Sequence, residues 1–218
     1  MIDRRVFVMG AGAAIGVAVV AEARTEPGSP VFESGPLARN TVARSFLTVP
    51  SDVRLPQIGL SSNGGTRRLD QLSGKVRIVS LWAEWCLPCL LEAVDLSVLR
   101  HRFAGSGFDI LAILTAGRAG FDQAQAQAKL VRLGAAHLPT WVEPSNGRKV
   151  GEALAGTDPP YVSLPCNLLI DRDGRVRGRS IGNGLGRAAG GRSHWATDDA
   201  ARFVGALAEG ALDRIAKA

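Results

Sequence analysis

The sequence of 218 residues has few cysteines and few histidines, and this scarcity excludes several kinds of stabilised or metal-binding protein. Three cysteines are too few for a disulfide-rich scaffold and too few for a zinc site made of four cysteines. The three histidines, His101, His137 and His194, show no paired ligand spacing. A zinc site is therefore disfavoured, and we expect no bound metal.

The sequence also lacks a run of basic residues interleaved with aromatic ones. The formal net charge is +6, but the arginines are scattered along the chain. This distribution favours an ordinary solvated surface over a nucleic-acid-binding stripe, so we expect no nucleic-acid partner. Hydrophobic residues make up 46% of the chain and charged residues 21%, as in ordinary globular proteins, and the length suits one domain with additional segments.

The N-terminal residues have the pattern of an export signal. Arg4 and Arg5 precede an uncharged run over residues 6–21, and Ala21 and Ala23 form an A-x-A cleavage candidate. Residues 1–23 are therefore predicted to be an export signal or a membrane anchor, with 6–21 as the tether if it is retained. The stretch DRRVFV is typical of twin-arginine export, and the general secretory route remains open. The protein is expected in the periplasm.

Two further segments follow the signal. Residues 24–45 are rich in Pro, Gly, Ser and Arg without a hydrophobic period, and this composition predicts a flexible linker. Residues 46–218 are predicted to form one domain in which strands and helices alternate. Short apolar runs predict strands, and apolar residues at helical spacing predict helices. The predicted strands cover residues 75–81, 108–114 and 138–142, with a hairpin over 165–171 and 175–181; the predicted helices cover 86–103, 121–133, 149–154 and 198–216.

The stretch WAEWCLPC places two cysteines where a buried strand gives way to a helix. At a helix N-terminus, free backbone N–H groups and the helix dipole stabilise a thiolate, so Cys86 is the predicted nucleophile. Cys89 lies one turn further on and can close a small disulfide with Cys86. Pro88 stands in the first turn, where its missing N–H is no loss. The pattern predicts thiol–disulfide exchange; half of a zinc site and an inert disulfide are the alternatives.

The same stretch resembles the thioredoxin active-site signature. The segment from Leu55 to Gly210 is similar to the exported thioredoxin-like disulfide reductases of the TlpA type, in LPQIGLSSNGGTRRLDQLSGKVRIVSLWAEWCLPCLLE, FDILAIL, SLPCNLLIDRDGRV and HWATDDAARFVGAL. The resemblance implies an α/β thioredoxin fold: a mixed central sheet with helices on both faces and an added N-terminal β-hairpin. It also implies that Pro165 is in cis and faces the disulfide, where it contributes backbone for substrate strands. The other residues expected to contact substrate are Trp85, Leu87, Pro88 and Leu164.

Several positions depart from the thioredoxin pattern. Ordinary thioredoxins carry a buried Asp two residues before the first Trp, where this chain has Ser80. Glu84 could replace that base, but the pattern places this position in solvent. Glu92, one turn after Cys89, is a candidate proton-handling or partner-binding carboxylate. Cys166 follows Pro165 where the family usually has Thr, so it is either a small buried side chain or a modulator of the active-site pair.

The resemblance predicts an enzyme that reduces partner disulfides outside the cytoplasm. It needs no metal, nucleotide or flavin, but it needs a membrane electron donor, because an oxidising compartment would otherwise leave the pair oxidised. It suggests partners in the assembly of copper sites in cytochrome oxidase. One alternative is a cytochrome c maturation thiol reductase, although PPYVSLPCN does not match that group's stretch around the proline. Another is a Cu(I)-binding chaperone that uses Cys86, Cys89 and Cys166.

Overall fold

The computed structural model describes residues 28–50, 52–55, 57, 59–62, 64–68, 74–105, 107–155, 162–181 and 192–215. The predicted export signal, residues 1–23, lies outside these ranges. None of the helices within them combines the length and the apolar character that crossing a membrane requires.

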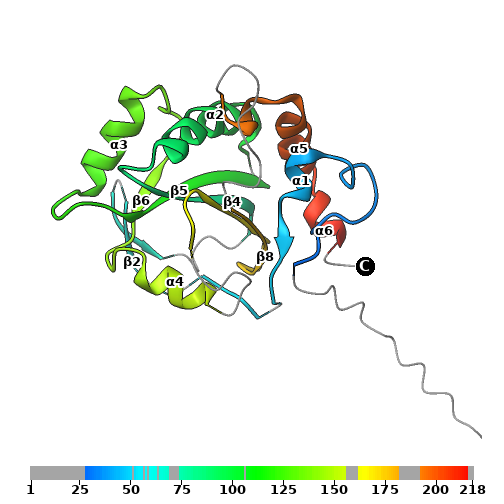
Figure 1. Cartoon of the computed structure of the whole chain (residues 1–218), viewed down its shortest axis with the longest axis horizontal. Coiled ribbons are helices and arrows are strands. Elements are labelled where there is room, and N and C mark those ends of the chain that lie inside the picture. The colour runs from blue at the N-terminus through cyan, green and yellow to red at the C-terminus, as the bar shows by residue number, and fades with distance from the viewer. Residues whose placement is uncertain are drawn as a thin grey trace, which may run out of the picture.

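A single mixed sheet forms the centre of the described structure, with strand order β1-β8-β7-β4-β5-β6-β2-β3 (Figure 1). Strands β4, β5 and β6 are parallel, and β7 is antiparallel to β4. The hairpin of β2 and β3 extends the sheet beyond β6, as the resemblance implies. The strands are β1 Leu47–Thr48, β2 Gly59–Ser62, β3 Gly65–Arg68, β4 Val76–Ala83, β5 Phe108–Ala116, β6 Thr140–Val142, β7 Cys166–Ile170 and β8 Val176–Ile181.

Helices cover both faces of this sheet, which confirms the predicted fold class. Helices α1, α2, α3 and α5 share a core with one face, and α4 lies on the other (Figure 1). Every residue of the central strand β4 is buried, as expected for a strand covered on both sides. The helices are α1 Thr41–Arg44, α2 Leu87–Phe103, α3 Gln123–Arg132, α4 Arg148–Leu154, α5 Asp198–Ala208 and α6 Ala211–Ile215, with a 3-10 turn η3 His194–Ala196.

Alternate residues of β4 enter two different cores, because successive side chains of a strand point to opposite faces. Ile78 and Trp82 pack towards α2 and α5. Val79 and Leu81 pack towards α4. Trp82 is 1% exposed, and its indole N–H donates to Thr140 Oγ1 at 3.0 Å, so this tryptophan joins β4 to β6 inside the core.

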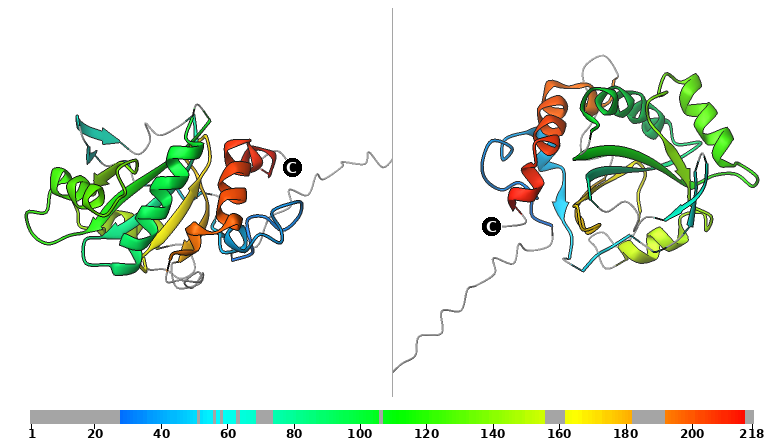
Figure 2. Two further views of the ribbon diagram at one scale, coloured as in Figure 1. Left: turned by 90° about the horizontal axis from the view of Figure 1, so that it is seen from above. Right: turned by 180° about the vertical axis from the view of Figure 1, so that it is seen from behind.

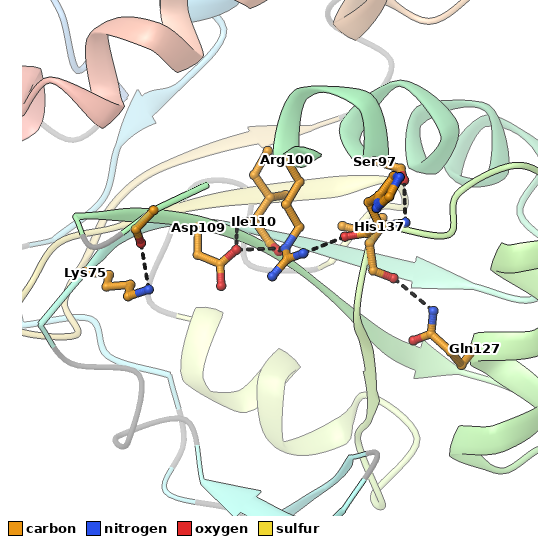
Figure 3. A network of polar contacts seen from close by, with 9 residues as sticks. Lys75, Ser97, Arg100, Asp109, Ile110, Gln127 and His137 are labelled. Carbon is orange, nitrogen blue, oxygen red and sulfur yellow. Dashed lines mark hydrogen bonds and ion pairs between the residues drawn. The ribbon is translucent and has the colours of Figure 1, made fainter. Parts of the chain in front are cut away.

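Helix α2 is tied to the sheet near its C-terminal end by the guanidinium of Arg100 (Figure 3). Its Nε donates to Asp109 Oδ1 at 2.8 Å and to the Ile110 carbonyl at 3.1 Å, and its Nη1 donates to the His137 carbonyl at 2.8 Å. The His137 N–H donates to Ser97 Oγ at 3.0 Å. These bonds hold the helix against β5 and thereby fix the direction in which its N-terminus points.

The linker prediction is wrong for the described residues 28–45. Phe32 and Val42 are 3% and 1% exposed and belong to the core beside α5. The Thr41 N–H and Asn40 Nδ2 donate to the Asp199 side chain and carbonyl at 2.9 and 2.8 Å, so α1 lies against the start of α5 (Figure 2). The few apolar residues of this segment are separated by turn-forming ones, so they have no regular hydrophobic period that would predict their burial.

The predicted last helix, 198–216, is two helices. Helix α5 begins at the predicted cap, since Thr197 Oγ1 accepts from the Ala200 N–H at 3.2 Å. It ends before Gly210, whose φ of +83° lies in the left-handed region that glycine adopts readily. Helix α6 then starts in a new direction and places Leu212 in the same core.

Candidate active site

Cys86 and Cys89 form a disulfide at the N-terminus of α2, with their Cα atoms 5.3 Å apart. Cys86 is the N-cap residue, and its Sγ accepts the Cys89 N–H at 3.4 Å. Pro88 occupies the first turn. The N-cap position gives a Cys86 thiolate the free N–H groups and the positive end of the helix dipole. These lower the pKa of a thiol and make it a better nucleophile.

Exposed apolar side chains surround the disulfide. The two cysteines are only 5% and 2% exposed, whereas Trp85 is 70% and Leu87 is 59% exposed. Large apolar side chains that remain in water beside a reactive bond are suited to contact a partner protein. The structure therefore places Trp85 and Leu87 on the surface beside the disulfide.

The strand next to β4 brings Pro165 to the same edge of the sheet. Cys166 pairs with Leu81 across β4 and β7, so Pro165 and Leu164 lie level with the end of β4 that leads into Cys86. The Leu164–Pro165 peptide bond is cis. Pro165 is buried and Leu164 is half-buried.

Glu92 lies one turn after Cys89 on the buried side of α2 and is 3% exposed. Its Oε2 accepts from Asn167 Nδ2 at 3.0 Å, and its Oε1 lies 3.8 Å from His194 Nδ1. Burial raises the pKa of Glu92 to about 7, and the hydrogen bond from Asn167 opposes this rise. A buried carboxyl group that titrates near neutral pH, beside a cysteine pair, is able to take up and release a proton there.

Three buried polar atoms without a hydrogen-bond partner in the described structure belong to neighbours of Glu92: Asn167 Oδ1, His194 Nε2 and Trp195 Nε1. The Trp195 indole lies close enough to Glu92 to oppose the rise of its pKa, yet it makes no hydrogen bond of normal geometry. Burial lowers the pKa of His194 to about 4, which keeps its imidazole neutral. Unpaired buried polar atoms are rare and tend to mark functional sites.

Asp95, one turn after Glu92, fixes the segment that carries His194. Its carboxylate accepts from Ser193 Oγ at 2.7 Å and from Arg192 Nη2 at 2.9 Å. Neither Asn167 nor the Asp95 carboxylate is predicted from the sequence, and His194 is noted there only as a histidine without paired ligand spacing. No local pattern marks them, because they meet Glu92 only through tertiary contacts between α2, β7 and η3.

Ser80 and Glu84 differ in how they fit the thioredoxin pattern. Ser80 pairs directly with Asn167 across β4 and β7, on the side of the sheet that faces Glu92. Glu84, expected in solvent, is 9% exposed instead, and its Oε1 accepts the Arg118 N–H at 2.9 Å. The loop after β5 covers Glu84, which is why the expectation from the pattern fails.

Cys166 is a free, fully buried thiol in the core on the α4 side, whereas Cys86 and Cys89 belong to the core on the α2 side. Burial raises the pKa of the Cys166 thiol to about 12, so it stays protonated. This placement favours a packing role, with the Cys166 side chain on the opposite face of the sheet from the core that contains Cys86 and Cys89. Across the part of the chain that the structure describes, no three Cys, His, Asp or Glu side chains gather as metal ligands.

Comparisons with known proteins agree with this fold. Residues 50–179, more than half of the chain, match the model of the AhpC/TSA family. The thiol:disulfide interchange protein HelX of Rhodobacter capsulatus is 26% identical over 113 residues, which cover 52% of this chain and 56% of that relative. The chain thus spans little more than half the length of the curated relative it matches.

Two solved structures share the fold at low sequence identity. The solution structure of a thiol:disulfide interchange protein from Bacteroides sp. has a TM-score of 0.54 and 20% identity, over 75% of this chain and 93% of that one. The thioredoxin domain of a thiol-disulfide oxidoreductase from Bacteroides vulgatus has a TM-score of 0.51 and 18% identity, over 71% and 98%. The family match shows that this chain belongs to the AhpC/TSA family, and the two structures show that it has the thioredoxin fold.

Proposed function

We propose that this protein is a thiol–disulfide oxidoreductase that reduces disulfides of partner proteins. The observation that carries the proposal is the Cys86–Cys89 disulfide at the start of α2, with Trp85 and Leu87 exposed beside it. The name of the relative HelX, a thiol:disulfide interchange protein, supports the same activity.

The reaction begins from the reduced pair. The Cys86 thiolate attacks one sulfur of the partner disulfide, and the other partner sulfur leaves as a thiolate. Cys89 then loses its proton and attacks Cys86 Sγ, which closes the enzyme disulfide and releases the second partner thiolate. Two electrons have moved from the enzyme to the partner.

Glu92 is the proposed acceptor of the Cys89 proton. Its carboxyl group is buried one helical turn from Cys89, and its pKa of about 7 lets it exist in both states at neutral pH. Asn167 holds the carboxylate in place through its Nδ2 donor. Ser80, which stands where thioredoxins have their Asp, cannot accept a proton in this way.

Substrate contact falls to the residues around the disulfide. Trp85, Leu87 and Pro88 would cover the partner's cysteine, and Leu164 and Pro165 would align its backbone just before the start of β7. The ring of Pro165 fixes its φ, which restricts the backbone conformation at this position. No metal or organic cofactor takes part in the proposed steps.

The compartment and the partners complete the proposal. The export pattern of residues 1–23 supports a periplasmic location, either released or tethered to the inner membrane through residues 6–21. A membrane dithiol donor would return the two electrons after each turnover. We further propose that the partners belong to the assembly of a respiratory oxidase copper site, in line with the resemblance to the TlpA type.

Insulin reduction tests the activity. The wild-type protein and Cys166→Ser are expected to reduce insulin disulfides at similar rates in the presence of dithiothreitol, whereas Cys86→Ser is expected to be inactive. Equal turnover by wild type and Cys86→Ser would overturn the proposal. Cys89→Ser expressed in whole cells is expected to trap partners as mixed disulfides at Cys86, which mass spectrometry can identify.

A further inference from the structure

A pocket of about 370 Å³ opens beside the disulfide loop, at the edge where β5 and β6 end. Its wall is mixed: Leu114, Phe121, Val142 and Pro144 give it an apolar part, and Arg118, Glu143 and Asn146 give it a polar part. Two loops close around it, and Asn146 joins them by accepting the Gly117 N–H at 3.0 Å through Oδ1. Asn146 has a φ of +53°, the only positive value at a non-glycine residue in the described ranges. Asparagine adopts this left-handed conformation more readily than most residues, and here it lets the Asn146 side chain reach Gly117 and join the two loops.

Glu84 connects this pocket to the active-site loop. The Glu84 N–H donates to the Ala116 carbonyl at 3.4 Å, and Glu84 Oε1 accepts from the N–H of Arg118, a residue of the pocket wall. Glu84 is two residues before Cys86. The pocket thus lies on the β5 side of the disulfide, whereas Leu164 and Pro165 lie on the β7 side.

The exposed charge at the pocket rim is positive. The carboxylate of Glu143 is buried and accepts hydrogen bonds from Ser145 N–H, Ser145 Oγ and Gly147 N–H. These donors stabilise its negative charge within the pocket wall. Arg118 is 72% exposed, with its guanidinium 5.3 Å above the Phe121 ring and its Nε 3.7 Å from Glu84. A guanidinium that lies on an aromatic ring presents its edge to incoming carboxylates.

We propose that this pocket binds an apolar side chain of the partner protein next to an acidic one, and that Arg118 selects for the acid. The inference rests on the proposed function. Neighbouring strands lie about 5 Å apart, and an extended chain advances about 3.3 Å per residue. A partner segment that crosses the sheet edge from Leu164 past Cys86 brings its second or third residue beyond the cysteine over the pocket. The positive net charge of the chain, +6, adds long-range attraction for such a partner.

Short synthetic peptides test the proposal with the full-length, pre-reduced protein. Each peptide carries one cysteine as a mixed disulfide with 2-mercaptoethanol, and a Phe–Glu, Phe–Lys, Ala–Glu or Ala–Lys pair at the second and third positions before or after it. Stopped-flow tryptophan fluorescence gives the rate constant for each peptide. This rate constant is normalised by dividing it by the rate constant that the same protein shows with bis(2-hydroxyethyl) disulfide. We expect the better-placed Phe–Glu peptide to react about tenfold faster than its Ala–Lys counterpart, from apolar burial and one exposed ion pair.

A matched pair of variants isolates Arg118. Arg118→Gln keeps the backbone bond to Glu84 and is expected to reduce the preference for Glu over Lys from about threefold to about one. Arg102→Gln removes a similar guanidinium, 4.9 Å above the Phe103 ring at the far end of α2, and is expected to keep the wild-type preference. Wild-type protein that reacts with all peptides at equal normalised rates would overturn the proposal.

Binding without chemistry separates the pocket from the oxidoreductase activity. A Phe–Glu peptide with Ser in place of Cys is expected to shift the amide NMR signals of Gly117 and Asn146, and an Ala–Lys peptide is not. If the protein reacts with no disulfide at all, the proposed function fails, and this titration still decides the pocket. Absence of a shift at Gly117 and Asn146 with millimolar Phe–Glu peptide would exclude the pocket as a binding site.

Discussion

Replacing Glu92 with Gln should change how the stability of the oxidised protein depends on pH. The glutamine is nearly isosteric, and its side-chain oxygen can still accept the Asn167 Nδ2 donor that bonds Glu92 Oε2 at 3.0 Å. What the substitution removes is the ability to ionise. In the oxidised protein the two active-site cysteines do not titrate, so the effect of Glu92 is not mixed with theirs.

The direction and size of this change in stability follow from the raised pKa of Glu92. Burial raises this pKa from 4.5 to about 7, so the folded state holds the proton more tightly than the unfolded state does. The resulting stability is fully present below pH 4.5 and is lost as the pH rises through about 7. At 1.36 kcal/mol for each unit of pKa, the total loss is about 3 kcal/mol. Glu92 is 3% exposed, so solvent screening reduces this figure little.

Urea unfolding of the oxidised protein between pH 4 and pH 8 measures this effect. Relative to wild type, Glu92→Gln is expected to gain about 3 kcal/mol in unfolding free energy over that range, with the change centred between pH 4.5 and 7. Glu152→Gln, whose side chain is 61% exposed on α4, is the matched control and should follow wild type throughout. If the wild-type and Glu92→Gln curves stay parallel from pH 4 to pH 8, the buried carboxyl group does not have the raised pKa on which its proposed role depends.

Three further substitutions test separate parts of the structure. Phe32→Ala should lower the unfolding free energy by about 3–5 kcal/mol, because Phe32 is 3% exposed and packs edge-on against Phe203; exposed Glu33→Ala is its control, and equal stability of both variants would restore the linker interpretation. Cys166→Thr should leave the reduction potential of Cys86–Cys89 unchanged within error in a glutathione redox buffer, and a shifted potential would give Cys166 a modulating role. Thr197→Ala should cost about 1 kcal/mol in thermal unfolding through the lost cap of α5, and an unchanged Tm would contradict that cap.

The parts of the site that the sequence predicts well are those decided by neighbours in the chain. Cys86 lies at the junction of an apolar run and a helical period, so its place as the N-cap of α2 follows from local patterning alone. Thr197 caps α5 for the same reason, since the cap bond spans only three residues. The central strands can also be predicted locally, because β4 and β5 are covered on both faces and consist mainly of apolar residues, interrupted by Arg77 and Ser80 in β4 and by Asp109 and Thr115 in β5.

The parts that the sequence does not predict depend on contacts between distant segments. Phe32 becomes part of the core only because α5 lies beside it. The described part of its segment, 18 residues with few apolar positions, has no hydrophobic period that would predict this burial. Glu84 occupies a turn that looks solvent-exposed until the loop after β5 brings the Arg118 N–H onto it. In both cases a neighbour from elsewhere in the chain overrides the local preference.

The surroundings of Glu92 combine a departure from the thioredoxin pattern at Ser80 with a contact from a distant part of the chain. The loss of the thioredoxin aspartate at Ser80 leaves a polar position on β4 without a proton acceptor, yet the residue paired with it, Asn167, donates to Glu92 from 75 positions away. The Glu92 carboxyl group thus lies on the helix that carries Cys89 and reaches the layer between that helix and the sheet. Because a buried carboxyl group without partners would be costly, the chain must also supply donors, and Asn167, with His194 nearby, lies at that place. Ser80, Asn167 and Glu92 therefore come together in one buried layer through pairing of β4 with β7 and through the Asn167–Glu92 hydrogen bond, neither of which a local sequence pattern reveals.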